Sequence, residues 1–310
     1  MSKAIKPDRV RYIKLGRGGD WEEECVRDGI ARFGFGSASD ERFPLCRAGK
    51  WNELTTSFLE AGKDKGTATR FTNESRLFFE DDGTTLWITF AREHLYWGFL
   101  SHDPAEQHQS SDGVFRRVVG GWRSTDINGE PLSKNRLSGA INKLAAYRGT
   151  TCDVDVEQYV IRRINGEKTA EVEIANEALR EMIEAVVGML RLLTWHDFET
   201  LVGLVFSVSG WRRQGDVGGP QKTIDIEITL PTTGERAFVQ VKSSTDQAEL
   251  DKYVAQFETL SYDRMFYIYH SAKKSLAEPD DKTITVVGPL KLAEMVVEAG
   301  LVSWLIRKVS

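Results

Sequence analysis

The stretch of residues 222–244, KTIDIEITLPTTGERAFVQVKSS, places several polar side chains where they could hold a metal ion. It reads as two short strands joined by a Pro-Thr-Thr-Gly turn, and residues two positions apart in a strand lie on the same face. Asp225 and Glu227 therefore share a face of the first strand. Gln240 and Lys242 share a face of the second strand. If the strands pair through the turn, a carboxylate, an amide and an ammonium group converge.

An ordinary structural interpretation of this pattern stays open. The same two strands carry an apolar set made of Ile224, Ile226, Ile228, Phe238, Val239 and Val241. The polar face could simply be exposed to solvent and carry a cross-strand ion pair, which adds little stability. The neighbouring elements have to decide between the two interpretations.

A predicted helix with the sequence WHDFETLVGLVFSVSG precedes the strands, and Glu199 interrupts its apolar face. A glutamate near the helix start could be a capping residue, because negative charge is favourable at a helix N-terminus. It could also help to hold a cation. Phosphodiester cleavage needs a hard divalent cation held by oxygen ligands and a cationic group near the attacking water.

These side chains together have the chemistry of a metal-dependent nuclease. Asp225 offers an anionic oxygen, and Gln240 offers an amide oxygen next to a strand carbonyl. Lys242 lies where it could orient or deprotonate a water molecule. The sequence from DFETLVGLVFSVSGW through TIDIEI to FVQVKS resembles the Mrr-type branch of restriction endonucleases, in the PD-(D/E)xK superfamily. The resemblance covers about residues 190–290.

The resemblance implies a role for each matching residue. Glu199 corresponds to the helical glutamate of the family and Asp225 to its metal-binding aspartate. Gln240 replaces an acidic residue, as is typical of this branch, and Lys242 completes the Gln-x-Lys pair. Glu199, Asp225 and Gln240 are then the expected ligands of Mg²⁺, for which Mn²⁺ can substitute. The implied fold is a restriction-endonuclease-like α/β domain with a central mixed sheet.

The sequence departs from the family pattern in one loop. The family usually has an Asp-Gly-Gly-(Ile/Val)-Asp run, whereas here Asp216-Val-Gly-Gly is separated from Asp225 by PQKTI. The role of Asp216 is therefore left open. Glu227 is an additional carboxylate, and an exposed strand residue is its simplest interpretation.

Composition narrows the class of protein without identifying it. The chain has 310 residues, 41% hydrophobic and 28% charged, and no apolar run approaches the roughly 18 residues of a membrane span. Three scattered cysteines give neither a disulfide framework nor a zinc spacing, which predicts a cytoplasmic protein. The net charge is −5, yet residues 1–150 hold 23 basic and 21 acidic side chains. A local basic groove for nucleic acid is compatible with this distribution.

The pattern of the chain changes near residue 165. Residues 1–165 contain strand-like runs separated by turn residues, which predict a compact β-rich or α+β barrel. These runs are VRYIKLG, GIARFGFG, TTLWITF, HLYWGFL, FRRVVGGW and VEQYVIRRI. A connecting helix is expected over residues 166–190, where apolar residues recur with a helical period. Residues 191–310 form the expected catalytic domain.

Five of the eight tryptophans lie in the first 122 residues and raise the question of a binding function. Tryptophan is most often a core residue. A pocket for an extruded base, however, needs aromatic walls and a few groups that read the base edge. Trp21, Trp87 and Trp97 are candidates for such walls. Arg17 lies in a Gly-rich turn directly before Trp21, and a turn of this kind can hold a phosphate.

The arrangement TTLWITF followed by HLYWGFL distantly resembles PUA-like domains of the EVE, ASCH and YTH type. Those domains read modified bases and occur fused to restriction nucleases. The resemblance spans about residues 8–165. It implies that the first domain recognises DNA carrying a modified base.

Two functions from different classes follow. The first is a Mg²⁺-dependent endodeoxyribonuclease of modification-dependent, type IV-like restriction. It would cleave modified double-stranded DNA of phage or foreign origin, as a homodimer at least during cleavage, without a membrane partner. The second is a nucleic-acid reader with a non-catalytic nuclease-like scaffold, and a repair nuclease for damaged or branched DNA is a further alternative. The presence of all four matching residues favours the enzyme, because a scaffold does not need them.

Overall fold

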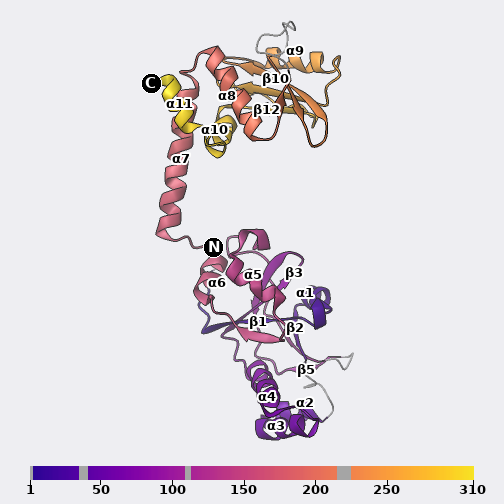
Figure 1. Cartoon of the computed structure of the whole chain (residues 1–310). Coiled ribbons are helices and arrows are strands. Elements are labelled where there is room, and N and C mark those ends of the chain that lie inside the picture. The colour runs from indigo at the N-terminus through magenta and orange to yellow at the C-terminus, as the bar shows by residue number, and fades with distance from the viewer. Residues whose placement is uncertain (1–2, 35–40, 109–112, 215–224) are drawn as a thin grey trace. The chain divides into compact units, whose positions relative to one another are not determined.

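The computed structural model describes residues 3–34, 41–108, 113–214 and 225–310, so Asp216 and Ile224 lie outside the described residues. The chain divides into two compact units, unit 1 (Met1–Thr169) and unit 2 (Ala170–Ser310). Both units combine helices with sheets (Figure 1), which confirms the expected mixed α/β class. Within the described ranges, no helix has the length and apolar character needed to cross a membrane.

Unit 1 contains two small sheets, with strand orders β4-β3-β1-β7 and β2-β6-β5. The first sheet is made of β1 (Arg9–Ile13), β3 (Thr85–Ala91), β4 (His94–Phe99) and β7 (Thr151–Asp153). The second is made of β2 (Ile30–Phe33), β5 (Glu106–Gln107) and β6 (Val114–Arg117). β1 pairs with β3 in parallel and with β7 antiparallel. The described strands do not close into the barrel that the sequence predicts.

One predicted strand of unit 1 is a helix. The run VEQYVIRRI forms α6 (Glu157–Ile164), in which Val160 and Ile164 are the buried residues. Residues four positions apart share a face of a helix, so this apolar pair follows the helical period rather than the strand period. The other elements near the sheets are η1 (Arg17–Gly19), α1 (Glu22–Asp28), η2 (Lys134–Arg136), α5 (Gly139–Asn142) and η3 (Lys143–Ala146).

A helical segment that the sequence analysis does not anticipate lies between β2 and β3. It consists of α2 (Arg42–Arg47), α3 (Trp51–Glu60) and α4 (Lys65–Phe79). These helices share a small core made of Cys46, Leu54, Phe58 and Ala68. So few buried apolar residues spread over three helices give only a weak periodic signal.

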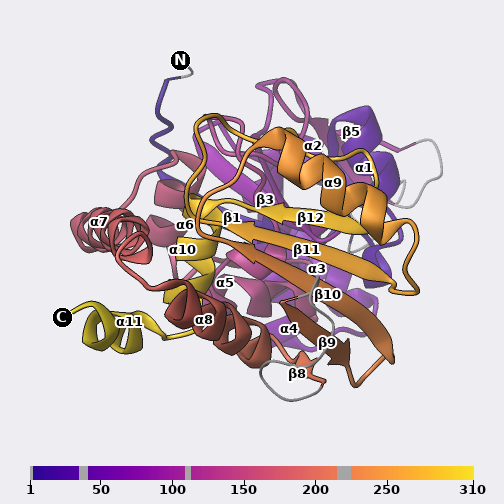
Figure 2. The same cartoon turned by 90° about the horizontal axis from the view of Figure 1, so that it is seen from above.

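Unit 2 is built around a sheet with the strand order β12-β11-β10-β9-β8, and Figure 2 shows the strands side by side in this order. The strands are β8 (Arg212–Arg213), β9 (Ile226–Leu230), β10 (Glu235–Lys242), β11 (Arg264–Tyr269) and β12 (Ile284–Val287). β10, β11 and β12 run parallel, whereas β9 is antiparallel to both of its neighbours. The helices are α7 (Ala170–Leu190), α8 (Trp195–Val208), α9 (Gln247–Phe257), α10 (Pro289–Glu298) and α11 (Val302–Val309).

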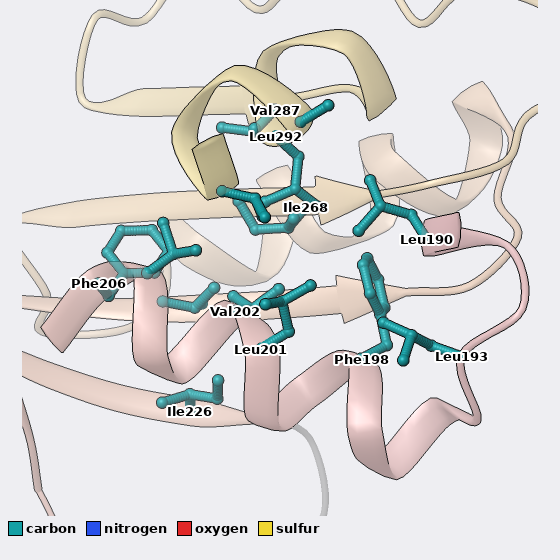
Figure 3. Packing of buried hydrophobic residues seen from close by; sticks show 14 of the residues in the cluster. Leu190, Leu193, Phe198, Leu201, Val202, Phe206, Ile226, Ile268, Val287 and Leu292 are labelled. Atoms are coloured by element: carbon teal, nitrogen blue, oxygen red, sulfur yellow. The ribbon is translucent and has the colours of Figure 1, made fainter. Parts of the chain in front are cut away.

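Helices cover both faces of this sheet. Val239 and Ile226 pack against α8 and α10 on one face, where Figure 3 shows the interlocking side chains. Phe238 belongs to the other face and packs with Leu250 and Phe257 of α9. Phe238 lies on the same face as Gln240, so the alternative of a polar face exposed to solvent does not hold at Gln240, which is 2% exposed. Glu227, on the same face, stays partly exposed.

The apolar stripe expected for the connecting helix is covered toward one end only. Val186 and Leu190 of α7 are buried in the core of unit 2. Ile174 and Leu179, nearer its start, are 69% and 48% exposed. The last turns of α7 therefore belong to the packing of unit 2.

Candidate active site

Asp225 and Gln240 meet at the start of β9, as the strand pairing requires. The antiparallel register places Glu227 opposite Phe238, so the residue two positions before Glu227 lies opposite Gln240. Gln240 Nε2 donates a hydrogen bond to Asp225 Oδ2 over 2.5 Å, and Val241 N donates to the same oxygen over 2.8 Å. Oδ2 accepts both of these hydrogen bonds, and Oδ1 accepts neither of them.

Burial affects the pKa of Asp225 and the hydrogen bonding of Gln240. Burial raises the pKa of Asp225, and the nearby Glu199 carboxylate raises it further, against the lowering effect of the Val241 N–H group. Gln240 is 2% exposed, and its Oε1 has no hydrogen-bond partner among the described residues. An unsatisfied buried acceptor costs about 1–3 kcal/mol. Oε1 is therefore an oxygen that a cation or a bound water would stabilise.

Lys242 lies two positions beyond Gln240 on β10 and is held by two side chains of α9. Its Nζ forms an ion pair with Glu249 Oε1 at 3.0 Å and lies 4.9 Å from the centre of the Tyr253 ring. Burial alone would lower the pKa of Lys242, but hydrogen bonds with Tyr253 and Glu249 outweigh burial and raise it. Lys242 therefore keeps its proton at neutral pH. The raised pKa favours Lys242 as a donor that orients a water molecule or a phosphate oxygen.

Glu199 reaches the same region from α8. The hydroxyl of Thr194 accepts a hydrogen bond from the backbone N–H of Asp197, so Thr194 caps the helix and Glu199 does not. Glu199 Oε1 pairs with Arg213 Nη2 on β8 at 3.1 Å, and its side chain is 15% exposed. Its charge acts on Asp225, whose pKa it helps to raise. The four matching residues thus interact in one region of unit 2.

The oxygen atoms around Asp225 fit a divalent cation such as Mg²⁺. Asp225 supplies a carboxylate, and Gln240 supplies a buried amide oxygen without a partner in the described ranges. Glu199 supplies the second carboxylate. No cluster of three or more His, Cys, Asp or Glu residues suited to a metal occurs in the described part of the chain. Two carboxylates and one amide oxygen suit a cation that keeps several water ligands, which is the usual behaviour of Mg²⁺.

Glu227 belongs to a different cluster. Its Oε1 pairs with Arg236 Nη2 of β10 at 2.7 Å, and this guanidinium lies 5.1 Å from the centre of the Tyr262 ring. The Glu227 side chain is partly exposed. This is the cross-strand ion pair that the ordinary interpretation predicts, but it involves Glu227 and not Asp225.

Three residues of the arrangement are missed by the sequence analysis: Arg213, Glu249 and Tyr253. Glu249 follows Asp246 by three positions, and the Asp246 side chain accepts a hydrogen bond from the Glu249 N–H group. This spacing is a helix-capping signal, so the sequence alone accounts for Glu249 without reference to Lys242. The sequence around Arg213 does not indicate its role, because its ion pair with Glu199 forms only when β8 joins the sheet.

In unit 1, Trp21 and Arg17 line one cavity of about 290 Å³. Lys14 and Arg148 add two more cationic side chains to its lining. Gly16 has a φ of 85°, and a Cβ at this position would lie 2.9 Å from Trp21 Cγ, so glycine allows the indole to pack on the turn. The Arg32 guanidinium lies 4.1 Å from the centre of the Trp21 ring. An aromatic ring beside cationic side chains is chemistry that can hold a base and a phosphate.

Trp87 and Trp97 do not line that cavity. They are 0% and 2% exposed, respectively. Trp87 Nε1 donates to Asp81 Oδ2 over 3.1 Å, and Trp97 Nε1 donates to the Thr125 carbonyl over 2.7 Å. Both indoles are packed and hydrogen-bonded in the core, where a base cannot stack on them. Of the predicted aromatic walls, only Trp21 shares a cavity with Arg17.

Comparison with known proteins yields no relative: no family model, no curated protein and no solved structure matches the chain significantly. The resemblances to Mrr-type nucleases and PUA-like domains therefore rest on short motifs of the sequence. What supports a function is the geometry of the site.

Proposed function

We propose that the protein is a Mg²⁺-dependent DNA endonuclease whose catalytic site lies in unit 2. One observation carries the proposal: Gln240, which is buried and has an unsatisfied amide oxygen, is hydrogen-bonded to the half-buried Asp225 near the ammonium group of Lys242. A structural ion pair would not require the orphaned oxygen. A metal-dependent phosphodiesterase would use both the oxygen ligands and the ammonium group of Lys242.

Each side chain has a distinct task in this proposal. A bound Mg²⁺ would neutralise charge on the phosphate and make the attacking water more acidic. Asp225 and Gln240 would hold the cation, with Glu199 as a further carboxylate oriented by Arg213. Lys242, fixed by Glu249, would donate hydrogen bonds to the water or to a phosphate oxygen and so align the two reactants.

We also propose that unit 1 selects the substrate as a PUA-like reader of modified bases. The cavity lined by Trp21 and Arg17 would receive an extruded base, with Lys14 and Arg148 near the backbone phosphates. The protein would then act in type IV-like restriction of phage or foreign DNA in the cytoplasm. Cutting both strands with one site per chain usually takes two copies, so a homodimer would form at least during cleavage.

The test combines cleavage with metal binding. The full chain is incubated with Mg²⁺ and phage DNAs that differ in base modification, beside unmodified DNA, and Mg²⁺ binding is followed by calorimetry. Cleavage of modified DNA alone supports the proposal, and Asp225→Asn should abolish Mg²⁺ binding without loss of the folded circular dichroism spectrum. Equal cleavage of all DNAs would contradict the selection by unit 1. Binding of modified DNA without cleavage of any DNA would favour a non-catalytic reader.

A further inference from the structure

A cavity of about 930 Å³ lies at the carboxyl ends of β11 and β12 in unit 2. Its lining includes Tyr269 at the end of β11, His270 directly after it and Gly288 after β12. In open α/β sheets, ligands bind outside the carboxyl ends of the strands. β10 ends at the same edge, because β10 and β11 are parallel and Lys242 lies opposite Tyr269. The cavity is therefore one strand away from the candidate active site.

Helix α10 begins at this cavity without a side-chain cap. Its N-cap residue is Gly288 and its first residue is Pro289, which has no N–H group. The backbone N–H groups of Leu290 and Lys291 are among the donors that have no partner within the helix. Both residues line the cavity. A Cβ at position 288 would lie 3.1 Å from Tyr269 Oη, so the glycine keeps space beside this hydroxyl.

His270 provides an independent observation. It lines the same cavity and is 6% exposed. Its Nδ1 lies 2.9 Å from Ser271 Oγ, whereas its Nε2 has no hydrogen-bond partner in the part of the chain that the structure describes. Burial, and then Arg191, lowers the pKa of His270, so the ring is neutral at neutral pH. Buried polar atoms nearly always have a partner, which points to a ligand or a bound water at this position.

The charges around the cavity favour an anion. Arg191, Lys274 and Lys291 line it together with Glu278 and Glu294. Lys291 and Glu294 form an ion pair at 3.0 Å, so Arg191 and Lys274 face one remaining carboxylate. A positive excess beside an uncapped helix N-terminus is the usual setting of a phosphate site.

We infer that this cavity binds a phosphate group, and that in a DNA complex it holds a backbone phosphate near the one that is cleaved. The choice of DNA as the source rests on the proposed function, whereas the phosphate site itself does not. The anion would accept hydrogen bonds from the backbone N–H groups of Leu290 and Lys291. Fixing a second phosphate would align the strand so that the cleaved phosphate reaches Asp225 and Lys242.

Two variants of one residue separate anion binding from packing. Gly288→Asp places a carboxylate at the N-cap, where it would accept hydrogen bonds from the first turn of α10 and so occupy the phosphate position. Gly288→Ala adds the same Cβ beside Tyr269 but no carboxylate. Both variants retain Asp225, Gln240 and Lys242.

The first measurement uses inorganic phosphate and the full chain without added metal. Amide NMR signals of Leu290 and Lys291 should shift saturably as phosphate is added. Affinity should fall about tenfold in Gly288→Asp and change less than about twofold in Gly288→Ala. Unshifted signals for these two amides, or equal losses in both variants, would overturn the phosphate site. This outcome is independent of whether the protein cleaves DNA.

The second measurement identifies the source of the phosphate. A 5′-mononucleotide and a modified DNA duplex are titrated separately, the duplex with Ca²⁺ in place of Mg²⁺, and cleavage kinetics are recorded with Mg²⁺. DNA as the source predicts that Gly288→Asp weakens duplex binding and raises KM, whereas Gly288→Ala matches the parent protein. If Gly288→Asp weakens binding of the mononucleotide alone, the assignment to a DNA phosphate is wrong.

Discussion

The candidate active site of unit 2 lies on the central strand of a sheet, whereas the candidate base cavity of unit 1 is built around a turn. In unit 2, β10 has a neighbouring strand on each side, and Asp225 is held by a side-chain amide and a backbone N–H group. In unit 1, Trp21 packs on a turn that depends on Gly16. Rigid elements suit groups that must be placed accurately, and loops suit recognition that varies among relatives. The proposed tasks match this difference: catalysis belongs to the sheet of unit 2, and selection of the substrate belongs to the turn of unit 1.

The largest expected effect concerns a tryptophan that belongs to neither site. Trp87→Ala should lower the free energy of unfolding by about 3–5 kcal/mol, because it removes a fully buried indole from the core of unit 1. Chemical denaturation followed by circular dichroism measures this change. If the variant is as stable as the parent but binds modified DNA less tightly, Trp87 is a wall of a binding site, and the distinction between core and cavity fails.

The second prediction tests the rigid site. Lys242→Met should reduce cleavage about 100- to 1,000-fold, as expected when one preorganised donor is lost from a catalytic site. DNA binding should stay nearly unchanged, because one phosphate contact among several is lost. Cleavage kinetics and fluorescence anisotropy measure the two quantities. Lys252→Met, at an exposed position of α9, is the control and should change neither. Parallel losses of binding and cleavage would make Lys242 a DNA clamp instead.

The third prediction tests the turn-based cavity. Trp21→Ala should weaken binding of modified DNA by about 1–3 kcal/mol, the usual contribution of one stacked base. The loss should exceed that for unmodified DNA and leave the rate of cleavage at saturating DNA unchanged. Anisotropy titrations with both DNAs provide the comparison. Equal losses for both DNAs would leave Trp21 as a general contact without a role in selection.

The smallest expected effect is a pH dependence that distinguishes the buried Glu74 of unit 1 from the half-buried Asp225 of unit 2. Glu74 on α4 of unit 1 is 7% exposed, and burial raises its pKa to about 7. The unfolded chain releases this proton near pH 4.5. The free energy of unfolding should therefore fall by about 1–2 kcal/mol as pH rises through this interval, after allowance for solvent screening.

Glu74→Gln cannot titrate, so this variant should remove that part of the pH dependence. Denaturation at pH 4.5 and pH 7.5 measures the difference between the variant and the parent. An identical pH dependence in both proteins would show that Glu74 is not the source, and Asp225 of unit 2, whose pKa burial also raises, would then be the group to examine.

The sequence predicts the meeting of Asp225 and Gln240 because strand periodicity and a short turn together determine which residues lie opposite each other. It does not predict that α9 covers this face, because the helix arrives from a later part of the chain. For the same reason the sequence does not predict that Phe238 packs against α9 on the face that carries Gln240. Tryptophans are harder still, since packing and base stacking use the same apolar surface, and only the fold separates Trp21 from Trp87. The roles in catalysis and base recognition stay predictions.

The pairing of Glu199 with Arg213 has a consequence for how the site responds to heat. Arg213 lies on β8, a strand of two residues at the edge of the sheet that the described residues form, and edge strands exchange their backbone groups with water most readily. Gln240 lies on the central strand β10 and is hydrogen-bonded to Asp225, so we expect this pair to separate only when the whole unit melts. Warming would therefore detach β8 first and free Glu199 while the Asp225–Gln240 pair persists. Activity would decline gradually before the protein unfolds, because Glu199 of α8 would be the first residue of the site to lose its position.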